Sequence, residues 1–130
     1  MIEAELSRIV IDEAKHEQVI VLKERRGDRM LPIVIGMNEA AAIKMKLSGF
    51  SPPRPLTHDL ILAIMESLHV KLEKIVIDDL VDGTFHAKLY LRNTSEEPTI
   101  VDARPSDSIA LAVRTNAPIF VEEDVFDKLS

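Results

Sequence analysis

The chain has 130 residues, a formal net charge of −6 and no cysteine. This length supports a single domain with one core, and the lack of cysteine excludes disulfides and thiolate-held metals. No apolar run reaches the roughly 20 residues that a spanning helix needs, so we expect no membrane partner. The first residues contain no basic region followed by an apolar one, and we predict a cytoplasmic location.

The charges are unevenly distributed along the chain. Residues 1–54 carry 9 Lys and Arg against 8 Asp and Glu, whereas residues 55–130 carry 7 against 14. Because binding to a polyanion depends on clustered positive charge, we expect any DNA or RNA to contact a local site. The one candidate cluster is Lys23, Arg25, Arg26 and Arg29. It surrounds Gly27 and Asp28, a pattern more typical of an exposed hairpin tip than of a nucleic-acid contact.

The first part of the sequence predicts three strands followed by a helix. Apolar alternation in the first strand changes parity near Ser7 and Arg8, which indicates a β-bulge. Pro32 favours an edge position or a strand start, because proline cannot donate a ladder hydrogen bond. The strands are expected at residues 3–11, 19–22 and 31–35, and the helix between Gly36 and Ser48-Gly49.

A second helix is predicted over about residues 57–68 as a connector, with Thr57 as its cap. Its apolar positions recur at helical spacing and predict broad packing; they are Leu60, Ile61, Ile64, Met65 and Leu68.

The second part of the sequence repeats the order of the first. Ile75-Val76-Ile77-Asp78 repeats Ile9-Val10-Ile11-Asp12, and a parity break again precedes it, at Glu73-Lys74. Further strands follow at 85–92, at 99–103, which we expect to be buried, and at 117–121, with an apolar helix from Pro105 and a last turn or short helix over 122–129. We therefore predict a single α+β domain over residues 1–130. It contains an internally duplicated strand-strand-strand-helix unit, with half-repeats at about 3–49 and 70–115 and a mixed or antiparallel sheet.

Polar residues concentrate where strand 99–103 passes into the apolar helix. Asp102 and Asp107 flank Arg104, and such a group can hold a divalent cation and a phosphate, or can simply be an ion pair. Pro105, Ser106 and Asp107 also suit an ordinary helix start, in which side-chain oxygens accept from free amides. The residue types leave both interpretations open.

Two other places carry chemistry-bearing side chains. Thr57-His58-Asp59 combines a hydroxyl, an imidazole and a carboxylate, which suit proton transfer, metal binding or a plain helix cap. Glu39 is a candidate because the predicted repeat makes it equivalent to Asp107. The sequence contains no phosphate-binding loop, paired metal-binding histidines or nucleophile elbow, so P-loop, zinc-protease and serine-hydrolase activities have no support.

Three sequence blocks resemble the bifunctional nuclease domain family: Leu31 to Gly36, Arg54 to Leu60 and Asp102 to Ala112. The resemblance spans about residues 5–126 and implies the fold of that family and a nuclease activity on DNA and RNA. From residue type we expect His58, Arg104 and Asp107 to be catalytic, with His58 as acid or base and Arg104 on the phosphate. Asp102, Asp107, Asp59 and Glu39 are the candidate ligands of Mg²⁺ or Mn²⁺.

A non-catalytic oligomeric module that binds a partner or small ligand is the alternative. It explains the polar motifs as helix caps and rests on the acidic balance and the predicted duplication. Repeated three-strand units leave exposed edges, which Pro32 blunts only in part, so we expect a homodimer or a higher homo-oligomer.

Overall fold

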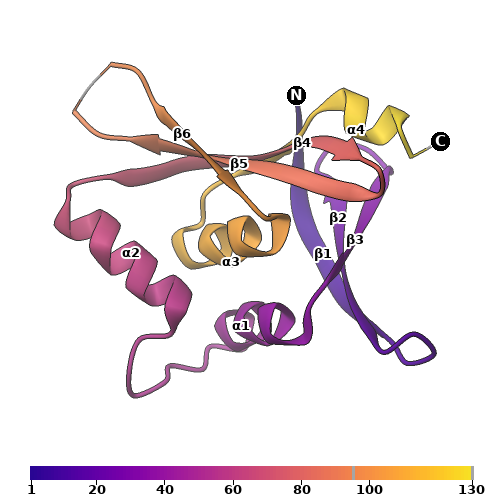
Figure 1. The fold of residues 1–130 in the computed structure, drawn as a ribbon, viewed down its shortest axis with the longest axis horizontal. Helices are drawn as coiled ribbons and strands as arrows, with labels where there is room; N and C mark the ends of the chain where they lie inside the picture. Colours follow the sequence, from indigo (N-terminus) through magenta and orange to yellow (C-terminus); the bar gives the residue numbers. More distant parts are fainter. Residues whose placement is uncertain (95, 130) are drawn as a thin grey trace.

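A computed structural model describes residues 1–94 and 96–129. In that part of the chain a seven-stranded mixed sheet and four helices form an α+β fold, which confirms the predicted fold class (Figure 1). The strand order across the sheet is β3-β2-β1-β7-β4-β5-β6. The strands are β1 (Ile2–Asp12), β2 (Glu17–Glu24), β3 (Met30–Ile35), β4 (Lys71–Val81), β5 (Thr84–Arg92), β6 (Thr99–Ala103) and β7 (Ile119–Val121). The helices are α1 (Met37–Leu47), α2 (Thr57–Ser67), α3 (Pro105–Thr115) and α4 (Glu123–Asp127).

The first three strands form an antiparallel meander. The register of β1 on β2 shifts between Leu6 and Arg8, which confirms the bulge expected from the change of parity. Strand β3 lies at one edge of the sheet, which is one of the two positions that Pro32 favoured. Gly36 then precedes α1 as its N-cap, and Ser48 is its C-cap.

The second three strands repeat this arrangement. Strands β4, β5 and β6 are antiparallel neighbours, and the β4–β5 register shifts between Leu72 and Lys74, at the expected second bulge. Strand β7 joins the two meanders, antiparallel to β1 and parallel to β4. The two meanders thus share strand order and one bulge position, although β4–β5 has a further register shift between Ile77 and Asp79, and the duplication itself stays a prediction.

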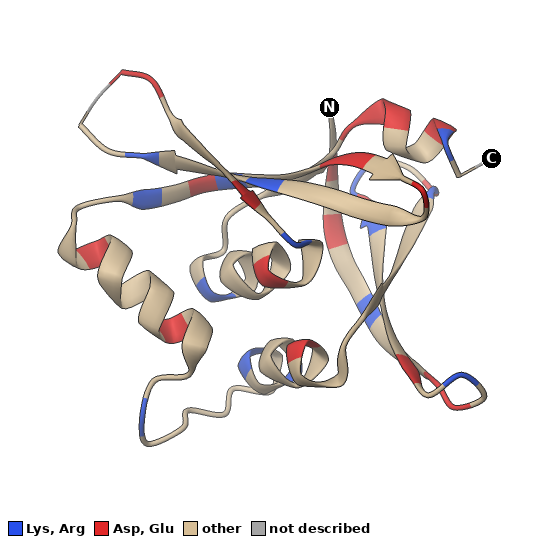
Figure 2. Cartoon of the chain, viewed as in Figure 1, with Lys and Arg blue, Asp and Glu red and all other residues tan. Residues whose placement is uncertain are grey.

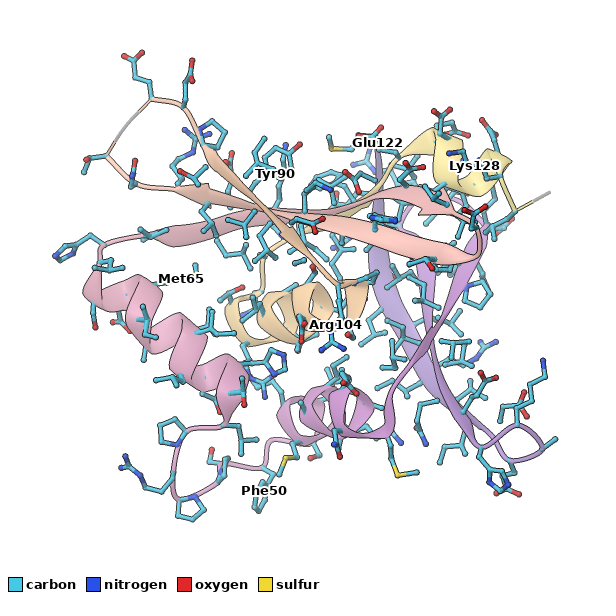
Figure 3. The ribbon with its side chains drawn as sticks, viewed as in Figure 1. Phe50, Met65, Tyr90, Arg104, Glu122 and Lys128 are labelled. Carbon is cyan, nitrogen blue, oxygen red and sulfur yellow. The ribbon has the colours of Figure 1, made fainter. Side chains whose placement is uncertain are left out.

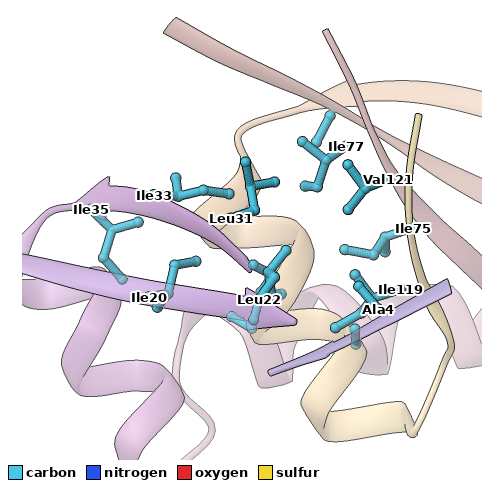
Figure 4. Packing of buried hydrophobic residues seen from close by; sticks show 14 of the residues in the cluster. Ala4, Ile20, Leu22, Leu31, Ile33, Ile35, Ile75, Ile77, Ile119 and Val121 are labelled. Carbon is cyan, nitrogen blue, oxygen red and sulfur yellow. The ribbon is translucent and has the colours of Figure 1, made fainter. Parts of the chain in front are cut away.

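The core combines residues from both meanders with the apolar face of α3. Figure 4 shows Leu31 near Ile77 and Val121, and each of these three side chains is almost fully buried. Ile109 and Leu111 of α3 are buried in the same cluster. Each such side chain contributes roughly 1.5–3 kcal/mol to folding, so α3 is firmly fixed.

Two predictions of burial were wrong. Strand β6 is the other sheet edge, where Ile100 is 51% and Val101 38% exposed. On α2, Leu60, Ile64 and Leu68 are more than half exposed, while Ile61 and Leu62 pack against the core. An apolar pattern gives the period of an element but not the neighbours that cover it. None of the described helices is long and apolar enough to cross a lipid bilayer.

Candidate functional site

The first turns of three helices line one cleft of about 340 Å³. Asn38 and Glu39 come from α1, Thr57 and His58 from α2, and Asp107 from α3. Glu39 and Asp107 are each the third residue of their helix, where a negative charge favourably faces the helix dipole. Arg104, the N-cap residue of α3, lies between α1 and α3 (Figure 3), and Figure 2 shows acidic segments on both helices.

Asp107 holds an imidazole and a guanidinium together. His58 Nε2 lies 2.9 Å from Asp107 Oδ1, while Arg104 Nε donates to Oδ2 at 2.9 Å and Nη2 to Oδ1 at 3.3 Å. Because an ionised carboxylate only accepts, we assign the imidazole proton to Nε2. In the neutral ring Nδ1 is then the basic nitrogen.

These contacts keep Asp107 ionised. Burial alone would raise the pKa of the carboxyl, but the hydrogen bonds from Arg104 and His58 outweigh it and lower the pKa below its ordinary value. The hydrogen bond to Asp107 and its charge, in turn, raise the pKa of Arg104. The carboxylate is therefore available to orient the imidazole at neutral pH.

Arg104 also connects the two helix starts. Its Nη1 donates to Glu39 Oε1 at 3.4 Å, and its side chain is 64% exposed. A guanidinium has five N–H donors, and three are directed at carboxylates, so the other two have no side-chain or backbone partner among the described residues. We call Glu39, His58, Arg104 and Asp107 the helix-start cluster.

Two predicted site residues have other partners. Asp102 on β6 is 76% exposed and bonds Lys88 Nζ at 3.1 Å; Lys88 also contacts Asp78 at 3.2 Å. We call Asp78, Lys88 and Asp102 the sheet cluster. Asp59 accepts hydrogen bonds from the Leu56 N–H at 3.0 Å and from Arg114 Nε at 2.9 Å, and it lines a different cleft.

The predicted side-chain caps are absent from the described starts of α2 and α3. Thr57 is the first helical residue rather than the N-cap, and Asp59 instead accepts from the N-cap amide of Leu56. On α3 the carboxylate of Asp107 binds side chains, and no side-chain cap bond is made. The plain helix-cap explanation therefore does not account for Asp107.

Sequence reasoning missed Arg114, whose side chain is only 5% exposed. Burial would raise the pKa of its partner Asp59, but the Leu56 amide and Arg114 lower that pKa below its ordinary value. The signal for Arg114 was an arginine directly after the apolar run Ile109 to Val113, seven residues after Asp107. Seven residues are two helical turns, so the two side chains share a face.

The candidate metal ligands do not form a complete metal-binding site. The described residues contain no group of three or more His, Asp or Glu side chains arranged to hold a metal ion. Glu39 and Asp107 alone share the cleft, because Asp59 and Asp102 are bonded elsewhere. Two carboxylates suit a Mg²⁺ that is bound mainly through substrate phosphates, but not a cation held by protein ligands alone.

The groups in the cleft are those that proton transfer at an anionic substrate requires. The sequence profile of the bifunctional nuclease domain matches residues 20–130, a range that includes the whole helix-start cluster. The chain belongs to the bifunctional nuclease domain family.

Individual relatives agree with this family. An uncharacterized protein of Mycobacterium tuberculosis is 46% identical over 117 residues, which cover 90% of this chain and 69% of that protein. Bifunctional nuclease 1 of Oryza sativa subsp. indica is 28% identical over 116 residues, or 88% of this chain and 35% of the rice protein. Bifunctional nuclease 2 of Arabidopsis thaliana is 23% identical over 112 residues, 85% of this chain and 34% of that protein. This chain thus spans about a third of the two plant proteins.

Proposed function

We propose that this protein hydrolyses phosphodiester bonds of DNA or RNA at the helix-start cluster. The observation that carries the proposal is that Asp107 is hydrogen-bonded to both His58 and Arg104 inside one cleft. In that arrangement His58 is an oriented base, and Arg104 is the group that binds the phosphate. Family membership and the nuclease names of the plant relatives support the same chemistry.

In this mechanism His58 acts as the general base. Nδ1 takes a proton from water as the water oxygen attacks phosphorus, and Asp107 stabilises the imidazolium that forms. The P–O bond to the leaving oxygen breaks, and the imidazolium returns the proton to that oxygen. The two open N–H groups of Arg104 bind the phosphate oxygens and offset the charge that develops on them.

A divalent cation would complement the charge of the cluster. With a neutral imidazole, the two carboxylates and one guanidinium sum to a net charge of −1, which disfavours a phosphate. Glu39 and Asp107 would be the protein ligands of a Mg²⁺ or Mn²⁺ that enters with the nucleic acid, and such an ion supplies charge neutralisation and activation of water.

Cleavage assays on single-stranded DNA and RNA test the proposal. We expect Asp107→Asn to lower turnover by about 10²–10⁴-fold, because His58 loses its oriented partner. Asp102→Asn is the matched control, since this carboxylate belongs to the sheet cluster and turnover should stay within about twofold. Equal activity of both variants would reject this site, and a chelator added to the same assays tests the cation.

The non-catalytic binding module is the second candidate function. The exposed apolar residues on α2 favour it, because a stripe of Leu60, Ile64 and Leu68 suits contact with another surface. If purified protein shows no cleavage with either metal, yet Asp107→Asn still changes its ligand or partner binding, this function replaces the nuclease.

A further inference from the structure

We propose that Arg114 and Asp59 are a positioning pair that locks the first turn of α2 onto α3 and thereby sets the orientation of His58 against Asp107. The effect on turnover rests on the proposed nuclease function, whereas the effect on the imidazole does not. Arg114 and Asp59 contact no reacting atom in this proposal; they act through His58.

Helices α2 and α3 contact each other through two side-chain pairs, and Arg114–Asp59 is one of them. His58 and Asp59 are consecutive on α2, while Asp107 and Arg114 are two turns apart on one face of α3. His58 Nε2 meets Asp107 Oδ1 at 2.9 Å, and Arg114 Nε meets Asp59 Oδ1 at 2.9 Å. Two such contacts fix both the position and the rotation of the α2 start, which one contact could not do.

Arg114 joins all three helices that line the cleft. Besides Asp59 on α2, it donates through Nη1 to the carbonyl of Ala110 on α3 at 3.0 Å and through Nη2 to the carbonyl of Ala42 on α1 at 3.2 Å. Ala42 lies one turn beyond Glu39. The planar fork of the guanidinium allows these three directions at once, and a lysine ammonium cannot reproduce it.

Apart from Ile61 and Leu62, which pack against the core, helix α2 has little apolar support. The apolar side chains of Leu60 and Ile64 are more than half exposed and so contribute little packing energy. Asp59 also accepts from the Leu56 amide, so the same carboxylate begins the helix and anchors it to α3. Loss of Arg114 should therefore let the α2 start, and His58 with it, move away from Asp107.

An ordinary structural ion pair would lower stability without changing His58. The test therefore follows the ring ¹⁵N chemical shifts of His58 at fixed pH, which report the hydrogen bond at Nε2, alongside melting temperature and steady-state kinetics. The variants are Arg114→Lys and the milder Asp59→Asn. Arg29→Met is the control, because Arg29 binds Glu24 and Glu123 away from the three helices and its loss also removes ion pairs.

We expect Arg114→Lys to shift the His58 ring signals toward those of a solvent-exposed imidazole and to lower kcat by at least about 10-fold with little change in KM. Asp59→Asn should produce the same changes to a smaller extent, and Arg29→Met should lower the melting temperature without moving the His58 signals. Unchanged His58 signals in folded Arg114→Lys and Asp59→Asn, or an equal shift in the control, would overturn the proposal. If the wild-type protein has no cleavage activity, the nuclease function fails while the ring signals still decide the positioning role.

Discussion

Two clusters in this chain share a charge pattern, two carboxylates around one cation, but differ in their setting. In the helix-start cluster, Arg104 bonds Glu39 and Asp107 at the first turns of two helices. In the sheet cluster, Lys88 bonds its cross-strand neighbour Asp102 and the nearby Asp78. The shared pattern shows that charge composition alone does not define a candidate site.

The differences lie in the cation, the cleft and the imidazole. In the helix-start cluster the guanidinium of Arg104 is largely exposed and the residues line a cleft of about 340 Å³. The imidazole of His58 also contacts the carboxylate of Asp107. The sheet cluster lies on three strands, outside that cleft, where Lys88 forms ion pairs with carboxylates of the two neighbouring strands. The comparison predicts activity effects from the first cluster and stability effects from the second.

Exchanging the two cations should give a large effect on activity. Arg104→Lys keeps the charge but loses the planar donors that bond two carboxylates and, in the proposed mechanism, a phosphate, so kcat/KM should fall by about 10²–10³-fold. Lys88→Arg, the reciprocal change in the sheet cluster, should leave kcat/KM within about twofold. Steady-state assays on single-stranded DNA and RNA measure both, and similar losses in the two variants would erase the distinction between the clusters.

Removing the sheet cation should act on stability instead. Lys88→Met leaves two carboxylates without their cation, and Asp78 Oδ1 is already buried with no hydrogen-bond partner in the described part of the chain. We expect a loss of about 1–3 kcal/mol in the free energy of unfolding, measured by urea denaturation. Asp102→Asn, which changes the more exposed carboxylate, should stay within about 0.5 kcal/mol. No loss in Lys88→Met would show that the cluster does not stabilise the sheet.

Most of the fold could be predicted because local patterns and the final structure agree. Parity breaks near Ser7 and at Glu73-Lys74 located two of the three register shifts, but not the one between Ile77 and Asp79, and Pro32 located one sheet edge. The errors occurred where burial depends on distant neighbours. Strand β6 is apolar like a core strand, but no further strand covers its outer side, and α2 likewise has no element beyond its exposed stripe in the described residues.

The candidate site could be predicted in part for a similar reason. Asp107, Arg104 and His58 stood at helix starts, which converge once the helices pack. Asp102, two residues before Arg104, belongs to a strand that pairs it with Lys88, a partner that sequence spacing cannot identify. Arg114 was missed because its partners come from three helices.

The unfolding free energies of the wild type and of Asp107→Asn should depend differently on pH. The pKa of Asp107 is lowered in the folded protein, below the value of about 3.9 expected when unfolded, so its ionised form stabilises the fold above that pH. This stabilisation is lost as the pH falls through the folded pKa. The difference in unfolding free energy between wild type and Asp107→Asn, about 1 kcal/mol or less because the side chain is partly exposed, should shrink below about pH 4. A difference that stays constant from pH 7 to pH 3 would contradict the ionised role.

The smallest expected effect is that of a single edge-strand substitution on self-association, because one added charge weakens strand pairing without abolishing it. We predict a homodimer or higher homo-oligomer, with β6 as the stronger candidate for strand pairing, because the other edge strand, β3, contains Pro32. Sedimentation velocity over a range of concentrations should show Ile100→Lys shifted modestly toward monomer. Val34→Lys places the same charge on the opposite edge strand β3, where Pro32 already hinders pairing, and should change the profile less. A wild-type chain that sediments as a monomer at every concentration would refute the oligomer, and a larger effect of Val34→Lys would move the interface to β3.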